Sequence, residues 1–246
     1  MIETVVSGGA GRLGSRIVAA IRDESDFTNP VLLGREDVPE SVLTPGRVLI
    51  ATAPHFVTVT HCEIAARNKV PVIVATTGFE TSERTKIEQL SNEIPVILAP
   101  NLSPGVTVLL DLVEKASRAL AEYDLEIFEI HHNKKKDAPS GTALALAEAA
   151  ARGRNRDAHR DMILARAGDV GERGRNEIGV QTLRGGDVIG EHTLMLIGQT
   201  ERLELVHRAQ TRDVFAAGAV VAARFIASAE PGLYTMRDVL GLSSEQ

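Results

Sequence analysis

Aromatic residues and cysteine are scarce in this chain of 246 residues, which has no tryptophan, 2 tyrosines, 6 phenylalanines and 1 cysteine. A core must therefore be built from Val, Ile, Leu and Ala, which suits a parallel sheet covered by helices. A single cysteine excludes an intramolecular disulfide, and we expect Cys62 to be a small buried residue rather than a nucleophile. Since no Cys/His spacing is typical of zinc, we predict no metal.

Long apolar runs and an excess of positive charge are also missing. No apolar segment approaches the roughly 20 residues that span a bilayer, so we expect no membrane span. The net charge is −6 and neither half of the chain is basic, which argues against nucleic acid as a partner. The first residues lack the basic flank and apolar stretch of a signal peptide, so we predict a cytoplasmic location.

Short β-rich runs alternate with helical segments over the first hundred residues. The predicted strands are Ile2–Ser7, Pro30–Leu33, Val48–Ala51, Val72–Ala75 and Val96–Leu98, and the predicted helices are Leu13–Ile21, Phe56–Asn68 and Ser82–Asn92. Strands that alternate with helices indicate βαβ units and a parallel sheet with helices on both faces. The fold class is therefore α/β.

The pattern changes after Pro104. A long helix at about Val106–Tyr123 precedes strands at Leu125–His131, Ile178–Arg184, His192–Leu196 and Glu201–Ala209, and a helix at Phe215–Ser228 follows. Strands so close in sequence favour a mixed or antiparallel sheet, hence a second, smaller α+β domain. We interpret the Arg-rich segment Arg152–Arg160 as a solvated loop.

A glycine-rich segment, Gly8-Gly9-Ala10-Gly11-Arg12-Leu13-Gly14, lies directly between the first strand and the first helix. Glycines at such a junction permit a tight turn and a close backbone approach to a pyrophosphate, which the helix N-terminus then binds. The context predicts a Rossmann-like dinucleotide-binding domain rather than an ordinary turn. Arg12 is either a phosphate contact or a solvated side chain.

The end of the second predicted strand bears on the choice of cofactor. Arg35 follows this strand, at the place where an acidic residue would bind the adenosine ribose. An arginine there favours a 2′-phosphate, so we predict NADPH in preference to NADH. Two alternatives stay open: Glu36 reaches the ribose, or Arg35 is only a surface residue.

Two loops follow the fourth and fifth predicted strands, at the edge where ligands bind in such sheets. They read Ala75-Thr76-Thr77-Gly78-Phe79 and Ala99-Pro100-Asn101-Leu102-Ser103. Their hydroxyls, amide and backbone groups suit a ribose or a nicotinamide carboxamide. Taken alone, each loop favours the interpretation of a plain turn over that of a binding loop.

The segment from Glu129 to Ala143 is the most informative of the chain: Glu-Ile-His-His-Asn-Lys-Lys-Lys-Asp-Ala-Pro-Ser-Gly-Thr-Ala. Three lysines and two histidines precede Asp137, and Ser140 is a candidate cap for a helix that starts at Gly141. An anionic ligand would relieve the repulsion among these cations and bind the first helical turn. A solvated basic loop is the alternative.

This pattern resembles the signature of the 4-hydroxy-tetrahydrodipicolinate reductase (dihydrodipicolinate reductase) family. Shorter motifs extend the resemblance over nearly the whole chain: the glycine loop, residues 76–79 and 99–101, Arg184-Gly185-Gly186-Asp187, Gly190-Glu191-His192-Thr193, His207-Arg208-Ala209, Gly232-Leu233-Tyr234 and 236–240. The resemblance implies NAD(P)H-dependent reduction of a small dicarboxylate in diaminopimelate and lysine biosynthesis. It also implies a homotetramer.

The resemblance further implies a role for each matching residue. His131 matches the proton donor and Lys135 the catalytic lysine, while His132, Gly141 and Thr142 match substrate-binding residues. The implied cofactor contacts are Gly8, Gly9, Ala10, Gly11, Arg12 and Leu13 at the pyrophosphate, Arg35 at the NADP phosphate, and Ala75, Thr76, Thr77, Ala99, Pro100, Asn101 and Leu102 on the nicotinamide side.

The implied family plan sets the domain boundaries. Residues 1–102 and 214–246 form the dinucleotide-binding domain, and residues 103–213 form the domain for substrate binding and oligomerisation. The chain departs from the family at Ala75, where a Gly is usual, at Gly34, where an acid is common, and in residues 51–55. These departures bear on cofactor preference and leave the catalytic segment intact.

Two other functions compete with this interpretation. One is a Rossmann-type reductase of a different small dicarboxylate, which the His-His-x-x-Lys spacing and Ser-Gly-Thr disfavour. The other is a non-catalytic NADP(H)-binding sensor, which would bind the cofactor without turnover. The remaining histidines are expected to be structural or solvated, although one of them stands in a family-like motif: His55, His61, His159, His207 and, in that motif, His192.

Overall fold

The computed structural model describes residues 1–242 of the chain. It divides into two compact units, Met1–Pro104 with the residues from Arg212 on, and Gly105–Thr211. The boundaries predicted from the sequence, at 102 and 213, lie two residues from these divisions. Within the described residues, no helix is long and apolar enough to cross a membrane.

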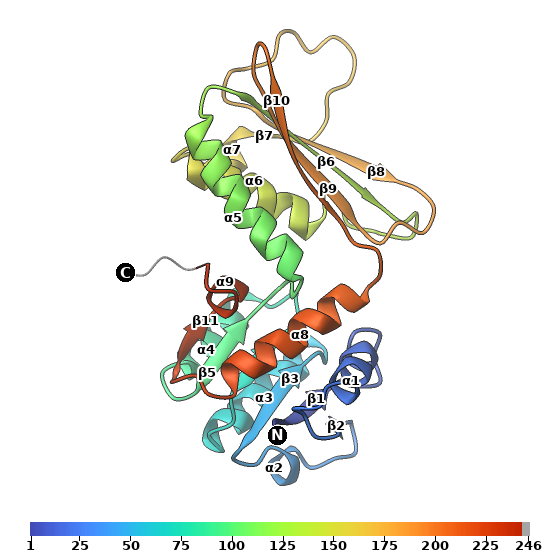
Figure 1. Ribbon diagram of the computed structural model, residues 1–246, viewed down its shortest axis with the longest axis vertical. Helices are drawn as coiled ribbons and strands as arrows, with labels where there is room; N and C mark the ends of the chain where they lie inside the picture. The colour runs from blue at the N-terminus through green and yellow to red at the C-terminus, as the bar shows by residue number, and fades with distance from the viewer. Residues whose placement is uncertain (243–246) are drawn as a thin grey trace. The chain divides into compact units, whose positions relative to one another are not determined.

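The first unit is a parallel six-stranded sheet with helices on both faces (Figure 1). Its strands are β1 (Glu3–Ser7), β2 (Val31–Leu33), β3 (Arg47–Ala51), β4 (Val72–Val74), β5 (Pro95–Leu98) and β11 (Gly232–Tyr234). Its helices are α1 (Gly14–Arg22), α2 (Pro39–Val42), α3 (His55–Arg67), α4 (Thr81–Leu90), α8 (Asp213–Ile226) and α9 (Met236–Val239). The Rossmann-like α/β fold is thus confirmed, and the short elements α2, α9 and β11 are additions to the predicted set.

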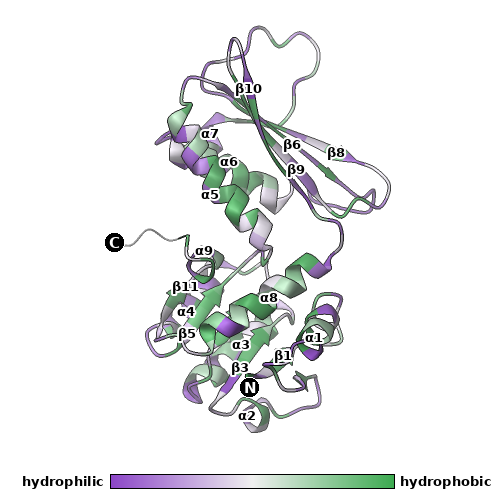
Figure 2. Cartoon of the chain, in the orientation of Figure 1, coloured by the Kyte–Doolittle hydropathy of each residue, from purple (hydrophilic) through white to green (hydrophobic). Residues whose placement is uncertain are grey.

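Aliphatic side chains fill both faces of this sheet, as the scarcity of aromatics requires. One layer joins the sheet residues Val6 and Ile50 to Ile17 of α1 and Val220 of α8, and a second layer lies against α3 and α4. Figure 2 shows hydrophobic colour along β3, β5 and much of α8. Helix α8 packs closely on the loop after β5 because Gly218 has no side chain. A Cβ on Gly218 would lie 1.7 Å from the Leu102 carbonyl oxygen.

The strand order β11-β5-β4-β3-β1-β2 reverses direction between β1 and β3. In open parallel sheets ligands bind at such a switch point, beside the carboxyl ends of the strands. The glycine loop follows β1 there, and it packs on the segment after β3, since a Cβ on Gly8 would lie 2.9 Å from the Ala53 nitrogen. The sheet therefore places the glycine loop where a dinucleotide is expected.

The second unit is a mixed five-stranded sheet in the order β10-β9-β6-β8-β7. Its strands are β6 (Asp124–His131), β7 (Met162–Ile163), β8 (Ile178–Arg184), β9 (Glu191–Ile197) and β10 (Arg202–Arg208), and its helices are α5 (Pro104–Ala119), α6 (Gly141–Gly153) and α7 (Ala158–Asp161). β6 runs parallel to β8 and antiparallel to β9. The predicted second domain with a mixed sheet is confirmed.

The central strand β6 carries the first residues of the segment from Glu129 to Ala143. Every second residue of β6 is buried, and this set begins with Leu125 and Ile127, which pack with α5 and α6 in one core. The same face of the strand continues to Glu129 and His131, because side chains alternate along a strand. The strand therefore carries two ionisable groups to the end of a hydrophobic core.

The interpretation of Arg152–Arg160 as a solvated loop is wrong. Helix α6 continues to Gly153, and α7 begins at Ala158. The half-buried Arg154 donates hydrogen bonds to the carbonyl oxygens of Leu120 and Tyr123, at 3.3 and 2.7 Å. These carbonyls lie just beyond the end of α5, where a cation is favourable. The arginine thus connects two helices.

Candidate active site

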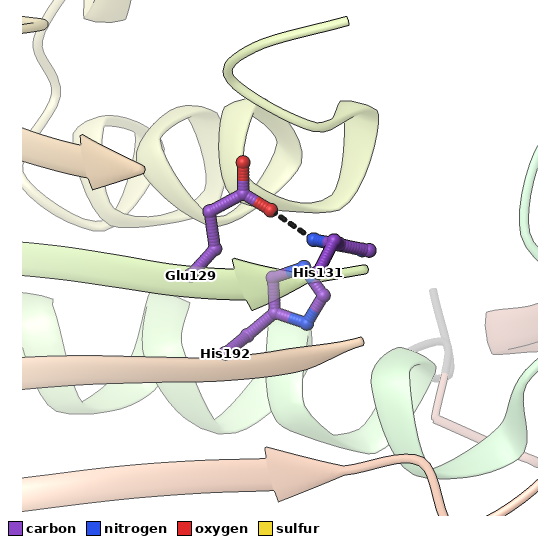
Figure 3. A group of neighbouring side chains, drawn as sticks. All are labelled: Glu129, His131 and His192. Carbon is purple, nitrogen blue, oxygen red and sulfur yellow. Dashed lines mark ion pairs between the residues drawn. The ribbon is translucent and has the colours of Figure 1, made fainter. Parts of the chain in front are cut away.

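Glu129 is the most enclosed ionisable group at the end of β6, with none of its surface exposed. Its Oε2 forms an ion pair with Nδ1 of His131 (Figure 3). Its Oε1 accepts hydrogen bonds from the backbone N–H of Ser140 at 2.9 Å and from the Thr182 hydroxyl at 3.2 Å, and the Arg184 guanidinium donates to it at 3.4 Å. Hydrogen bonds therefore satisfy Oε1, whereas the buried Oε2 is held by its ion pair with His131.

These contacts decide the charge of Glu129. Burial alone would raise its pKa, but the hydrogen bonds from His131 and from the backbone of Ser140 outweigh burial and hold the pKa at about 2. Glu129 is therefore a carboxylate at neutral pH. A carboxylate can only accept a hydrogen bond, so its ion pair with Nδ1 of His131 favours a proton on that nitrogen.

Ser140 closes the loop between β6 and α6 and caps the helix, as predicted. Its Oγ accepts a hydrogen bond from the Ala143 backbone N–H at 3.1 Å. The next residue, Gly141, is exposed, and a Cβ placed on it would meet nothing within 4 Å. The first residue of α6 thus has open space beside it, at the helix end whose dipole favours an anion.

His192 enters this group from β9, where it lies opposite Glu129. Its Nε2 is hydrogen-bonded to the Ser140 hydroxyl at 3.1 Å, and its ring lies edge-on to the His131 ring, with centroids 5.2 Å apart. Burial, then the nearby charge of His131, lowers the pKa of His192 to about 4. His192 is therefore a neutral side chain that packs against His131.

Glu129, His131 and His192 place ligand-type atoms within 4.8 Å of one another, a spacing that a metal ion could use. The chain itself already provides partners here: Glu129 pairs with His131, and His192 Nε2 bonds to Ser140. These contacts describe a hydrogen-bonded network.

The Lys-rich loop lies between this network and α6. The Lys135 ammonium donates to both carboxylate oxygens of Asp137, at 2.8 and 2.9 Å, and the Asp137 side chain is 63% exposed. The backbone N–H of His132 donates to the Val188 carbonyl at 2.7 Å, which ties the loop to the segment before β9. His132 and Lys135 are half-buried, whereas Lys134 and Lys136 are exposed.

The glycine loop of the first unit has the shape of a phosphate cradle. Gly8 adopts a φ of +76°, and the Gly11 N–H donates to the Gly8 carbonyl at 2.8 Å. A Cβ on Gly14 would lie 2.3 Å from the Gly8 carbonyl oxygen. Leu13 supplies no side-chain cap to α1, and the loop carbonyls of Gly11 and Leu13 accept instead from the N–H groups of Ser15 and Arg16, at 2.9 and 3.1 Å. Gly9 is buried, and Ala10 and Arg12 are exposed.

The other predicted cofactor residues surround the same edge of the sheet. Arg35 is exposed in the turn after β2, which is closed by a hydrogen bond from the Gly34 N–H to Asp37 at 2.8 Å. The Thr76 hydroxyl donates to the Ala53 carbonyl at 2.8 Å and holds its loop to the end of β3. Ala75 is half-buried and Thr77 exposed. Thr76 therefore has a structural role that the sequence did not indicate.

The loop after β5 is partly buried in the core and partly exposed. Ala99 and Leu102 are buried in the core layer beneath α8, whereas Pro100 is exposed. The Asn101 side-chain oxygen accepts from the Ser103 N–H at 2.9 Å. The side chain of Leu102 thus belongs to the core.

The structure brings together His131, Ser140 and the start of α6, and it adds residues that sequence reasoning had given no role: Glu129, Arg184, Gly190 and His192. One signal was available for Glu129, which stands two residues before His131 and so shares its strand face. His192 stood in a family-like motif, but only the pairing of β9 with β6 shows that it faces Glu129.

The chain matches two family descriptions in succession. "Dihydrodipicolinate reductase, N-terminus" matches residues 2–102, and "Dihydrodipicolinate reductase, C-terminus" matches residues 105–240. Two similar proteins are the 4-hydroxy-tetrahydrodipicolinate reductases of Syntrophus aciditrophicus, 38% identical over 99% of this chain and 100% of that protein, and of an Anaeromyxobacter species, 42% identical over 99% of each.

Solved structures give the same fold. A dipicolinate-bound dihydrodipicolinate reductase from Paenisporosarcina superposes with a TM-score of 0.77 at 20% identity, over 96% of this chain and 97% of that one. A probable dehydrogenase from Thermotoga maritima superposes with a TM-score of 0.64 at 10% identity, over 98% and 93%.

Proposed function

The chain belongs to the dihydrodipicolinate reductase family, and we propose that it reduces 4-hydroxy-tetrahydrodipicolinate to tetrahydrodipicolinate with NAD(P)H. Membership makes the chain an oxidoreductase of diaminopimelate and lysine biosynthesis that uses a nicotinamide dinucleotide. The observation that carries the proposed mechanism is a histidine paired with a buried carboxylate, which also accepts a hydrogen bond from the N-cap residue of a helix.

His131 is the proposed proton donor. The substrate takes up a hydride and a proton and loses its hydroxyl group as water, which balances the conversion to tetrahydrodipicolinate. The bound nicotinamide supplies the hydride. Since Nδ1 of His131 faces Glu129, Nε2 is the atom left to donate the proton, and a histidine is a suitable general acid near neutral pH.

The substrate carries two carboxylates, and the second unit offers complementary groups for them. Gly141 and Thr142 stand in the first turn of α6, where backbone N–H groups and the helix dipole favour an anion. Lys135 adds a cation whose partner Asp137 is exposed, so a substrate carboxylate can replace that partner. His132, half-buried in the same loop, is the further proposed substrate contact.

The first unit fits a dinucleotide. In the cradle formed by Gly8, Gly11 and Gly14, a Cβ on Gly8 or Gly14 would collide with backbone atoms, at 2.9 and 2.3 Å, and a pyrophosphate needs such a close backbone approach. We propose that the exposed Arg35 favours NADPH over NADH through a 2′-phosphate. The residues proposed to hold the rest of the cofactor lie in the loops after β4 and β5, at 75–77 and 99–102.

We also propose a homotetramer, built through the second unit. Exposed apolar side chains on β8 and β10, namely Leu183, Leu203 and Val206, support the proposal because association would cover them. Light scattering coupled to size exclusion tests it, and a monomeric mass would contradict it.

Oxidation of NADPH and NADH by freshly generated 4-hydroxy-tetrahydrodipicolinate tests the proposed reaction. We expect substrate-dependent oxidation with both cofactors and a higher kcat/KM with NADPH. Binding of NADPH without any oxidation would instead support the sensor alternative. A preference for NADH would contradict the role of Arg35 and leave the reductase assignment intact.

A further inference from the structure

Glu129 has no part in the proposed reaction, yet it is the most completely buried charge of the second unit's site. An isolated buried carboxylate is costly, and it persists only when it is paired and hydrogen-bonded. The two oxygens of the Glu129 carboxylate have different partners. Oε2 pairs with the ring of His131, and Oε1 accepts from the backbone of Ser140 and from Arg184.

The contacts of this network return to their starting point. Glu129 pairs with His131 through Oε2 (Figure 3), and its Oε1 accepts from the backbone N–H of Ser140. The Ser140 hydroxyl is bonded to Nε2 of His192, whose ring lies edge-on to the His131 ring at 75°. Ser140 is also the cap of α6. The imidazole of His131 is therefore held at Nδ1 by the Glu129 carboxylate and along one side by the His192 ring.

The opposite nitrogen of His131 faces Gly190. A Cβ placed on Gly190 would lie 3.0 Å from Nε2 of His131, closer than side-chain atoms normally approach. Because Gly190 has no side chain, Nε2 of His131 can occupy this position. Glu129 and Gly190 thus act on the two nitrogens of the same ring.

We propose that Glu129 is a positioning residue, which fixes the tautomer and orientation of His131 and ties the proton donor to the first turn of α6. This inference rests on the proposed function, in which His131 donates a proton. In the step itself, Nε2–H gives its proton to the reduced substrate, and Nδ1–H stays hydrogen-bonded to Glu129. Solvent then reprotonates Nε2, so no group other than His131 changes its charge over the cycle.

Other charged or titratable groups surround this ring and bear on any pH profile. They come from each neighbouring element: Arg184 from β8, His192 from β9, His207 from β10, and Lys135 from the loop after β6. Arg184 contacts Glu129 directly, whereas Lys135 and His207 act on His192 at longer range. The Asp137 carboxylate pairs with Lys135 and is exposed, so a variant of Glu129 changes the buried carboxylate of this group.

The test combines histidine NMR with steady-state kinetics on Glu129→Gln. Wild-type His131 is expected as the Nδ1–H tautomer when neutral. In the variant, a glutamine amide can donate to Nδ1, so we expect the Nε2–H tautomer to gain population. kcat should fall roughly 100-fold or more while KM changes less than threefold, because a carboxylate that orients a histidine acts on turnover. Glu129→Asp should recover part of kcat.

Glu126→Gln is the matched control. Glu126 stands on the same strand as Glu129 and pairs with Arg166 and Arg173, each at 3.0 Å. The same substitution there removes a structural ion pair, so we expect lower stability with kcat and the His131 tautomer unchanged. If Glu129 were merely structural, the two variants would behave alike, and the inference would be overturned.

The inference and the proposed function fail in different ways. A wild-type His131 in the Nε2–H tautomer overturns the inference without any variant, even if Glu129→Gln does not fold. A shifted tautomer with wild-type kcat in Glu129→Gln retains the positioning contact and contradicts proton donation by His131. Shifted tautomer and reduced kcat together support both.

Discussion

Helices α1 and α6 both begin with a glycine, yet the surroundings of the two glycines differ. A Cβ on Gly14 would lie 2.3 Å from a backbone carbonyl oxygen, whereas a Cβ on Gly141 would meet nothing within 4 Å. The start of α1 has no side-chain cap, and the start of α6 is capped by Ser140, which Glu129 and His192 hold in turn.

We propose that the two helix starts bind anions in different ways. In the first unit the proposed site depends on shape, since closely packed main chain leaves room only for glycine at position 14. In the second unit the proposed site depends on charge, since ionisable side chains fix the helix start and supply the proposed chemistry. The first site should therefore respond to added volume and the second to changes of charge.

Acid should weaken the second unit's network through His192. Its pKa falls from 6.5 to about 4 on folding, so the unfolded state binds more protons between these values. The contribution is complete above pH 6.5 and is lost as the pH falls to 4, up to about 3 kcal/mol. His192→Gln should flatten the dependence of the unfolding free energy on pH in this window, measured by urea denaturation.

The exposed His159 is the control for this measurement, and His159→Gln should leave the slope unchanged. Burial also lowers the pKa of His61 in the first unit, so part of the acid dependence should remain in the His192 variant. An undiminished slope in His192→Gln would contradict the network.

Loss of charge at Lys135 should impair the substrate site. Lys135→Gln removes a charged hydrogen-bond donor, worth about 1.5–3 kcal/mol, so kcat/KM should fall about 10- to 100-fold. Its neighbour Lys136 is exposed, and Lys136→Gln should change kcat/KM less than twofold. Equal losses in the two variants would indicate that the basic loop acts only through its overall charge.

Added volume should separate the two glycines. Gly14→Ala forces backbone apart and should destabilise the protein by about 1–3 kcal/mol and weaken NADPH binding. Gly141→Ala should leave stability unchanged or slightly higher, while its methyl group, beside the proposed carboxylate site, raises KM. Thermal denaturation and NADPH titration measure the difference, and loss of stability in Gly141→Ala would break the comparison.

The smallest expected effect concerns Arg35. Arg35→Ser should weaken NADPH binding about 3- to 10-fold through loss of one exposed phosphate contact, and it should leave NADH binding unchanged. Arg22→Ser, at the exposed end of α1, is the control. Equal effects on both cofactors would contradict recognition of the 2′-phosphate.

The sequence predicted the parts of this molecule that depend on local pattern. Alternating strands and helices indicated the parallel sheet, and the Ser-Gly-Thr motif indicated the start of α6, because periodicity and capping act within a few residues. Short elements such as β7 and β11 were missed, since they form only by pairing with β8 and β5.

Long-range contacts explain the remaining differences. The role of Arg154 depends on carbonyls more than 30 residues away, and that of His192 on the register of β9 against β6. Leu102 stands in a loop that looks suited to a ligand, but α8 packs over it through Gly218. Such contacts join segments that no local pattern relates.

One pair of variants tests the central claim most directly, that the end of β6 supplies the proton and the start of α6 binds the substrate. Steady-state kinetics should show His131→Ala with kcat reduced about 100- to 10,000-fold and Thr142→Val with an increased KM at nearly unchanged kcat. Equal and small effects of the two variants on kcat/KM would contradict the account.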